Sequence, residues 1–251
     1  MHYKTITACS DAKEERTVIY LHGWGGDASA FLFCAENLKD SYDGILVDFY
    51  GFGLTPEPET PLTVSDYADG VVEIMEKNGV RKAVFAGHSF GGRVAMEIAA
   101  KHPEKTVALA LVDSAGLKPR RGAGYYVKVA LHKLLKKLGG NGLKGSEDYR
   151  RLSPVMKATF CNVVNYDQTP LLKKIRCPVA VFWGENDTDT PPYMAKRLNR
   201  GIADSHVFWL KGGHFAYLED SANFLTVFRA FLNGVFPVAG EAGPSRLSER
   251  K

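Results

Sequence analysis

Six short apolar runs, separated by stretches with helical periodicity, constrain the fold of this 251-residue chain most. The runs are rich in Val, Ile and Phe and span residues 17–22, 44–49, 83–87, 106–113, 178–184 and 206–210. Because they are apolar on both faces, they are typical of strands in a parallel sheet that helices cover on both sides. Stretches such as 64–77, 92–101 and 192–200 have the helical period. The alternation predicts an α/β fold with a doubly wound, mostly parallel sheet.

The alternation is interrupted between Asp113 and Pro178, where no run is typical of a strand. Residues 126–138 predict an amphipathic helix with an apolar stripe opposite its lysines, and a second helix is expected from Glu147 to about Val164. We therefore predict a helical cap over residues 117–175, inserted into a core of residues 1–116 and 176–238. The tail, residues 239–251, is small and polar, and we expect it to be disordered.

Charge is distributed unevenly between cap and core. The formal net charge is +4, but residues 117–175 carry thirteen Lys and Arg against three acids, so that this segment is near +10 and the remainder near −6. The basic segment admits three interpretations: a solvated helix face, which we prefer, attraction of an anionic substrate, or contact with an anionic membrane surface. No nucleic-acid partner is expected.

Cysteine usage and the apolar runs bear on the compartment. No apolar run approaches the length of about 18 residues that a membrane helix needs, and the N-terminal residues are polar with no signal-peptide core. The four cysteines are scattered, with no C-x-x-C pair, which favours reduced thiols over a metal site. We expect a cytoplasmic protein that holds no metal or organic cofactor.

The strongest motif is AVFAGHSFGG at residues 83–92, in which a buried strand leads into a Gly-His-Ser-Phe-Gly turn and a helix follows at once. This is G-x-S-x-G in the strand–turn–helix context that the motif requires. Ser89 would lie on a strained turn at a helix N-terminus, where developing negative charge is stabilised. The glycines at 87 and 91 would let the strand and the helix approach each other closely. Ser89 is therefore the candidate nucleophile.

A second glycine-rich turn, YLHGWGG at residues 20–26, follows the first strong apolar run. Such a turn exposes backbone N–H groups, so the amides of Trp24 and Phe90 are the candidate oxyanion hole. His22 lies in the same turn, and we interpret it as a structural hydrogen-bonding residue within that loop.

The general base must be one of seven histidines. Only His214 follows a late strand in a glycine-flanked loop, LKGGHFAYLED, which would deliver an imidazole to the carboxyl edge of the sheet. The acid should lie between the nucleophile and the base in sequence. Asp187, just beyond a buried strand, is preferred; Asp113 at the end of the preceding strand is second, and Asp189 is third.

Taken together, the motifs LHGWGG, DFYGFG, GHSFGG, WGEND and KGGHF resemble, in this order, those of the α/β-hydrolase superfamily. The resemblance covers about residues 16–235 and is greatest to small capped esterases, C–C hydrolases and non-haem perhydrolases. It implies a Ser89–His214–Asp187 triad, oxyanion donors at Trp24 and Phe90, and a cap over 117–175. The N-terminus is short for this family, so at most one strand is expected before Thr17.

The resemblance implies hydrolysis of a small to medium carboxylic ester, or a related acyl substrate that could be anionic, through an acyl-enzyme and without a cofactor. Two alternatives stay open. A C–C hydrolase or menaquinone-pathway-type lyase would use the same triad, with Arg93 binding a substrate carboxylate; we prefer an ion pair at the helix start for Arg93. A ligand receptor on the same scaffold would bind with almost no multiple turnover.

Overall fold

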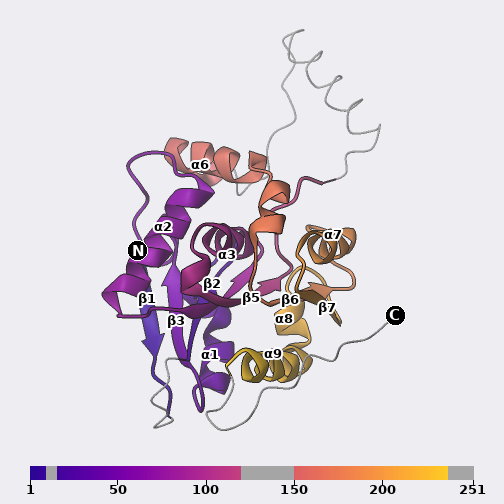
Figure 1. Ribbon diagram of the computed structural model, residues 1–251. Helices are drawn as coiled ribbons and strands as arrows, with labels where there is room; N and C mark the ends of the chain where they lie inside the picture. The colour runs from indigo at the N-terminus through magenta and orange to yellow at the C-terminus, as the bar shows by residue number, and fades with distance from the viewer. Residues whose placement is uncertain (10–15, 120–149, 237–251) are drawn as a thin grey trace.

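The computed structural model describes residues 1–9, 16–119 and 150–236, and Figure 1 shows one sheet with helices on both of its faces. The strands are β1 (His2–Ile6), β2 (Thr17–Leu21), β3 (Asp43–Asp48), β4 (Ala83–His88), β5 (Thr106–Val112), β6 (Val179–Gly184) and β7 (Ser205–Leu210). Their order in the sheet is β1-β3-β2-β4-β5-β6-β7. Only β1 is antiparallel to its neighbour, β3, and the other pairs are parallel. The predicted doubly wound, mostly parallel sheet is confirmed.

The helices divide between the two faces of the sheet. The described helices are α1 (Leu32–Leu38), α2 (Val64–Lys77), α3 (Phe90–Lys101), α6 (Pro154–Asn165), α7 (Tyr193–Gly201), α8 (Ala216–Glu219) and α9 (Ser221–Val235), with short 3-10 turns at Ala28–Phe31, Pro103–Lys105 and Thr169–Lys174. Buried side chains of α2, α3 and α7 form one apolar core with the sheet, and those of α1 and α9 form the other. The strands are therefore buried on both faces, as their apolar sequences require.

Local sequence signals set the helix ends. Thr63 caps α2 through a capping box with Asp66, so this helix begins and ends where its periodicity predicts. The helix expected from Glu147 to about Val164 is interrupted at residues 152–153, and α6 begins after this break at Pro154, while Glu147 itself lies outside the described residues. The Ser153 hydroxyl accepts a hydrogen bond from the Met156 N–H, and proline is favoured in a first helical turn. The Ser-Pro pair at 153–154 is the start signal that the periodicity alone does not reveal.

The remaining fold predictions concern the N-terminal strand, the cap and the tail. One strand, β1, precedes Thr17 in the described residues, as expected. The helix predicted at 126–138 and the tail at 239–251 lie outside the described residues, as do seven of the thirteen basic residues of the cap. Between β5 and β6 the described chain forms helix α6 and a 3-10 turn but no strand. Among the described helices, none is long and apolar enough to span a bilayer.

Candidate active site

Ser89 forms the turn between β4 and α3 and has φ of 48° and ψ of −107°. This left-handed conformation is strained for a residue with a side chain. Three backbone hydrogen bonds hold it: the Ser89 N–H donates to the Val112 carbonyl at 3.0 Å, and the Ser89 carbonyl accepts from Gly92 at 3.2 Å and Ala115 at 3.0 Å. The turn is thereby fixed to the end of the neighbouring strand β5, with the Ser89 side chain half-buried.

Two glycines of the motif are required by close backbone packing. A methyl group at Gly87 would lie 2.5 Å from the carbonyl carbon of Gly91, where strand and helix approach. A methyl group at Gly91 would overlap the carbonyl oxygen of Leu21. Any larger residue at these positions would push α3 away from β2 or β4, so the G-x-S-x-G spacing is a packing requirement of this turn.

The HGWGG loop lies against the serine turn. A methyl group at Gly23 would lie 2.8 Å from Nδ1 of His88 and 3.5 Å from Cβ of Ser89, which places Trp24 directly after the point of contact. Phe90 is the first residue of α3, so its N–H has no acceptor within the helix. The backbone amides of Trp24 and Phe90 therefore lie in the segments that flank Ser89.

His22 has the structural role predicted for it. Its buried ring donates from Nδ1 to the Gly23 carbonyl at 2.7 Å, and its Nε2 accepts from the Phe49 N–H at 3.2 Å. Burial lowers the pKa of His22. The neutral ring joins the loop after β2 to the end of β3 and so stabilises the backbone around Trp24.

Asp187 lies in the turn after β6, and its fully buried carboxylate accepts several hydrogen bonds. Oδ1 accepts from the backbone N–H groups of Asp189 at 2.8 Å and Thr190 at 2.9 Å. Oδ2 accepts from the Thr190 hydroxyl at 2.6 Å. Burial alone would raise the pKa of Asp187, but the hydrogen bonds from His214 and Thr190 lower it overall. Asp187 is therefore an ionised carboxylate in a fixed orientation.

His214 lies in the loop after β7, and its Nδ1 is 2.9 Å from Oδ2 of Asp187. The two loops are joined by their backbones, because the Asn186 N–H donates to the Gly212 carbonyl at 3.0 Å. Burial alone would lower the pKa of His214, but the hydrogen bond and the negative charge of Asp187 raise it above its usual value. The hydrogen bond assigns the proton of neutral His214 to Nδ1.

The loop of His214 also reaches across the sheet to the serine turn. Nε2 of His88 lies 2.7 Å from the His214 carbonyl, and the two rings are 4.9 Å apart, although β5 and β6 separate β4 from β7 in the sheet. Burial, followed by the charge of His214, lowers the pKa of His88 to about 3, so its ring is neutral. His88, which directly precedes Ser89, thus holds the loop of His214 against the serine turn.

The structure therefore brings the three predicted residues to one edge of the sheet, Ser89 after β4, Asp187 after β6 and His214 after β7. In the part of the chain that the structure describes, neither of the other two candidate acids forms a hydrogen bond with the imidazole. Among the described hydrogen bonds, Asp113 accepts from the Gly184 N–H at 2.7 Å, and Asp189 contributes its backbone N–H to Asp187. The roles of Thr190 and His88 could not be predicted from the sequence. The signals for them are a hydroxyl residue in the Asp187 turn and a histidine within the serine motif.

In the described residues, Arg93 has no ion pair of the kind expected at the start of α3. The buried guanidinium donates to the backbone carbonyl of Tyr166 at 2.8 Å. Burial lowers the pKa of Arg93 to about 10, while the charge of Asp167 acts in the opposite direction. Arg93 therefore links the chain after α6 to α3.

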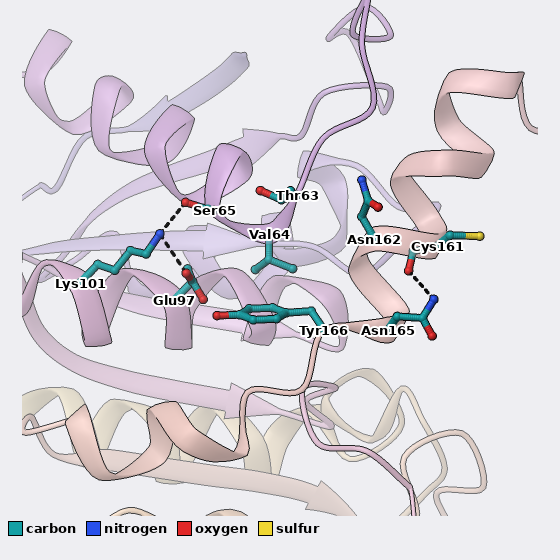
Figure 2. A pocket seen from close by; sticks show the side chains of 9 residues that line it. All are labelled: Thr63, Val64, Ser65, Glu97, Lys101, Cys161, Asn162, Asn165 and Tyr166. Carbon is teal, nitrogen blue, oxygen red and sulfur yellow. Dashed lines mark hydrogen bonds and ion pairs between the residues drawn. The ribbon is translucent and has the colours of Figure 1, made fainter.

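A hollow of about 610 Å³ lies beside this contact, between the start of α2, the second half of α3 and helix α6 (Figure 2). Tyr166 lies across it, and Lys101 joins Glu97 at 3.0 Å to the Ser65 hydroxyl at 2.5 Å. Asn162 donates across it to the Leu62 carbonyl at 3.1 Å. The polar groups of this hollow bond one another and join α6 to the core. None of the three predicted triad residues lines the hollow.

Comparison with known proteins places this arrangement in a family. The model of the alpha/beta hydrolase family matches residues 18–227. The chain belongs to the α/β-hydrolase family. The predictions of the family, of the fold and of a hydrolase enzyme are confirmed at this level.

The relatives differ in the activities for which they are named. A pimeloyl-[acyl-carrier protein] methyl ester esterase of Neisseria meningitidis is 27% identical over 247 residues, which cover 88% of this chain and 78% of that protein. The acetyltransferase component of the acetoin cleaving system of Cupriavidus necator is 29% identical over 146 residues, 58% of this chain and only 35% of that protein. The enol-lactonase of Burkholderia xenovorans has the same fold, with a TM-score of 0.73 and 20% identity, covering 92% of this chain and 96% of that one.

Proposed function

We propose that this protein is a serine hydrolase that cleaves small to medium carboxylic esters, with Ser89 as nucleophile, His214 as general base and Asp187 as the acid. The observation that carries the proposal is the 2.9 Å hydrogen bond between His214 and Asp187, beside a serine held at φ of 48°. Strained residues of this kind cluster at reactive sites. The similarity to an esterase is consistent with this activity.

In the proposed reaction, Oγ of Ser89 attacks the ester carbonyl as Nε2 of His214 removes its proton. The oxyanion is held by the N–H groups of Trp24 and Phe90. The carbon–oxygen bond of the ester then breaks, and His214 gives its proton to the leaving alcohol. Water, deprotonated in turn by His214, attacks the acyl-enzyme, and the proton returns to Ser89 as the acid is released. No cofactor takes part in these steps.

A cluster of aromatic rings beside the proposed site favours a substrate with an apolar acyl or alcohol group. The ring of Trp24 lies 4.9 Å from Phe52, 5.4 Å from Phe90 and 5.2 Å from Phe160 of helix α6, each edge to face. These rings lie next to the proposed oxyanion donors.

A panel of chromogenic esters of graded acyl length tests the proposal: we expect multiple turnover, fastest for one range of apolar acyl chains. Binding with no more than one turnover per protein would indicate a receptor instead.

The proposed base predicts a pH dependence. The rate should rise with pH as His214 loses its proton, because only the neutral imidazole accepts the Ser89 proton. Since Asp187 raises the pKa of His214, the midpoint of kcat/KM should lie above the reference value of about 6.5. The check is kcat/KM for one ester from about pH 5 to 9, with a solvent isotope effect to establish that chemistry is rate-limiting. A flat profile under that condition would exclude a histidine base.

The basic segment predicts a salt dependence if its charges face the substrate. The positive potential of residues 117–175 would raise the association rate of anionic esters, and screening would remove this gain as the Debye length falls from about 30 Å at 0.01 M salt to about 8 Å at 0.15 M. We therefore expect kcat/KM to fall with salt for a carboxylate-bearing ester and not for its neutral counterpart. Identical salt curves for the pair would leave a solvated face or a membrane surface, which sedimentation with anionic vesicles separates.

A further inference from the structure

Asp113 is the second acid beside the proposed triad, and its backbone is unusual. Ser89 and Asp113 are the two residues other than glycine with positive φ in the described chain, at 48° and 43°. They directly follow β4 and β5, which are neighbours in register up to His88 and Val112. Backbone strain of this kind persists only where the surroundings impose it, and it concentrates at functional sites.

Asp113 contacts both ends of the turn that carries Asp187. Its Oδ1 accepts from the Gly184 N–H at 2.7 Å, where the turn begins. Its backbone carbonyl oxygen lies 3.1 Å from the Thr190 hydroxyl, where the turn ends, and the single hydrogen of that hydroxyl is donated to Asp187 at 2.6 Å. Its N–H donates to the carbonyl of Phe182 at 2.9 Å. Asp187 lies between these points, so Asp113 determines the position of the carboxylate that bonds His214.

The hydrogen-bond geometry also separates the charges of the two acids. The Asp187 carboxylate accepts hydrogen bonds from two backbone N–H groups, one hydroxyl and one imidazole. The Asp113 carboxyl is fully buried and accepts one, while its Oδ2 has no hydrogen-bond partner within the described part of the chain. A buried carboxylate with a single hydrogen bond is costly, whereas one with four is stabilised.

We propose that Asp113 is a positioning residue that holds the Asp187 turn as an uncharged carboxylic acid, so that Asp187 is the charged carboxylate that bonds His214. This rests on the proposed function, in which Asp187 orients His214. The titratable groups that face Asp113 in the described residues are Asp187, His214 and Tyr217. Burial, with the charge of Asp187, raises the pKa of Asp113 to about 8, although the Gly184 N–H acts to lower it.

Two variants separate position from charge. Asp113→Asn keeps the acceptor for the Gly184 N–H, tolerates positive φ and has no charge. Its kcat/KM should therefore stay within about three-fold of the native value, and the low-pH midpoint of its kcat/KM profile should not move. Asp113→Gly adopts the same φ without strain but loses the side chain, so kcat should fall about ten-fold or more while KM changes little. If the low-pH midpoint of the kcat/KM profile moved to lower pH in the asparagine variant, Asp113 would be ionised in the native enzyme. Equal losses in the two variants would also contradict the proposal.

Two measurements need no turnover and so distinguish this proposal from the proposed function. Infrared spectra at about pH 6.5 should show a carboxylic-acid C=O band in the native protein that Asp113→Asn lacks, and this band should fade as the pH passes about 8. The low-field proton resonance of His214 Nδ1–H should persist in Asp113→Asn and broaden in Asp113→Gly. Absence of the band would overturn the neutral state of Asp113. An unchanged resonance in the glycine variant would overturn its positioning role.

Discussion

Replacing Ser89 by alanine is expected to lower kcat by at least about 10⁴-fold, because the acyl-enzyme then has no oxygen on which to form. The fold should be retained, since the hydrogen bonds that hold the turn come from backbone groups at residues 89, 92, 112 and 115. The measurement is steady-state turnover of the best ester from the panel, with circular dichroism and the thermal midpoint as measures of folding.

Ser114 provides a matched control. It lies two residues beyond β5, is buried, and its hydroxyl donates to the carbonyl of Ala115 at 2.8 Å. Ser114→Ala removes a hydroxyl from the same region without touching the proposed triad, so turnover should stay near the native rate. Retention of more than about a few per cent of activity in Ser89→Ala would show that another residue is the nucleophile.

Asp187→Asn should lower kcat by up to about 10⁴-fold, because the amide no longer favours the tautomer with the proton on Nδ1 or stabilises the imidazolium. The midpoint of the remaining pH profile should move to lower pH, since the hydrogen bond and charge that raise the pKa of His214 are lost. The check is kcat/KM as a function of pH for this variant and for Asp113→Asn, measured with the same ester.

The two variants form an internal comparison. Both convert a buried aspartate of the same region to an isosteric amide, but only Asp187 accepts a hydrogen bond from His214. Asp187→Asn should therefore be far more damaging than Asp113→Asn. The reverse order would move the acid to the end of β5 and would contradict the site described above.

The sequence predicts the sheet and its edge well, because parallel strands buried on both faces leave long apolar runs. The structure places strands over or within one residue of the six predicted runs. The amphipathic stretch 64–77 forms helix α2 at its predicted bounds, since Thr63 and Asp66 cap it locally. Helices α1 and α9 could not be located from the sequence pattern, and their apolar residues pack together against one face of the sheet.

Features that depend on contacts between distant segments could not be predicted. Arg93 bonds a carbonyl 73 residues away, and nothing near it in sequence indicates that partner. The preference for Asp187 over Asp113 was open in the sequence, because both follow buried strands, and the hydrogen bond to His214 distinguishes them only in three dimensions. The start of α6 at Pro154 is a different case, in which a local signal was present but the periodicity outweighed it.

The most direct test of the account is covalent labelling of the folded protein by a fluorophosphonate, followed by mass spectrometry of the intact chain and of its peptides. We expect one equivalent of label, on the peptide that contains Ser89, and no labelling of Ser89→Ala. Label should also form more slowly below the pKa of His214, because the protonated imidazole does not activate the serine. A native protein that hydrolyses esters but carries no label at Ser89, or carries it on another residue, would contradict the central claim.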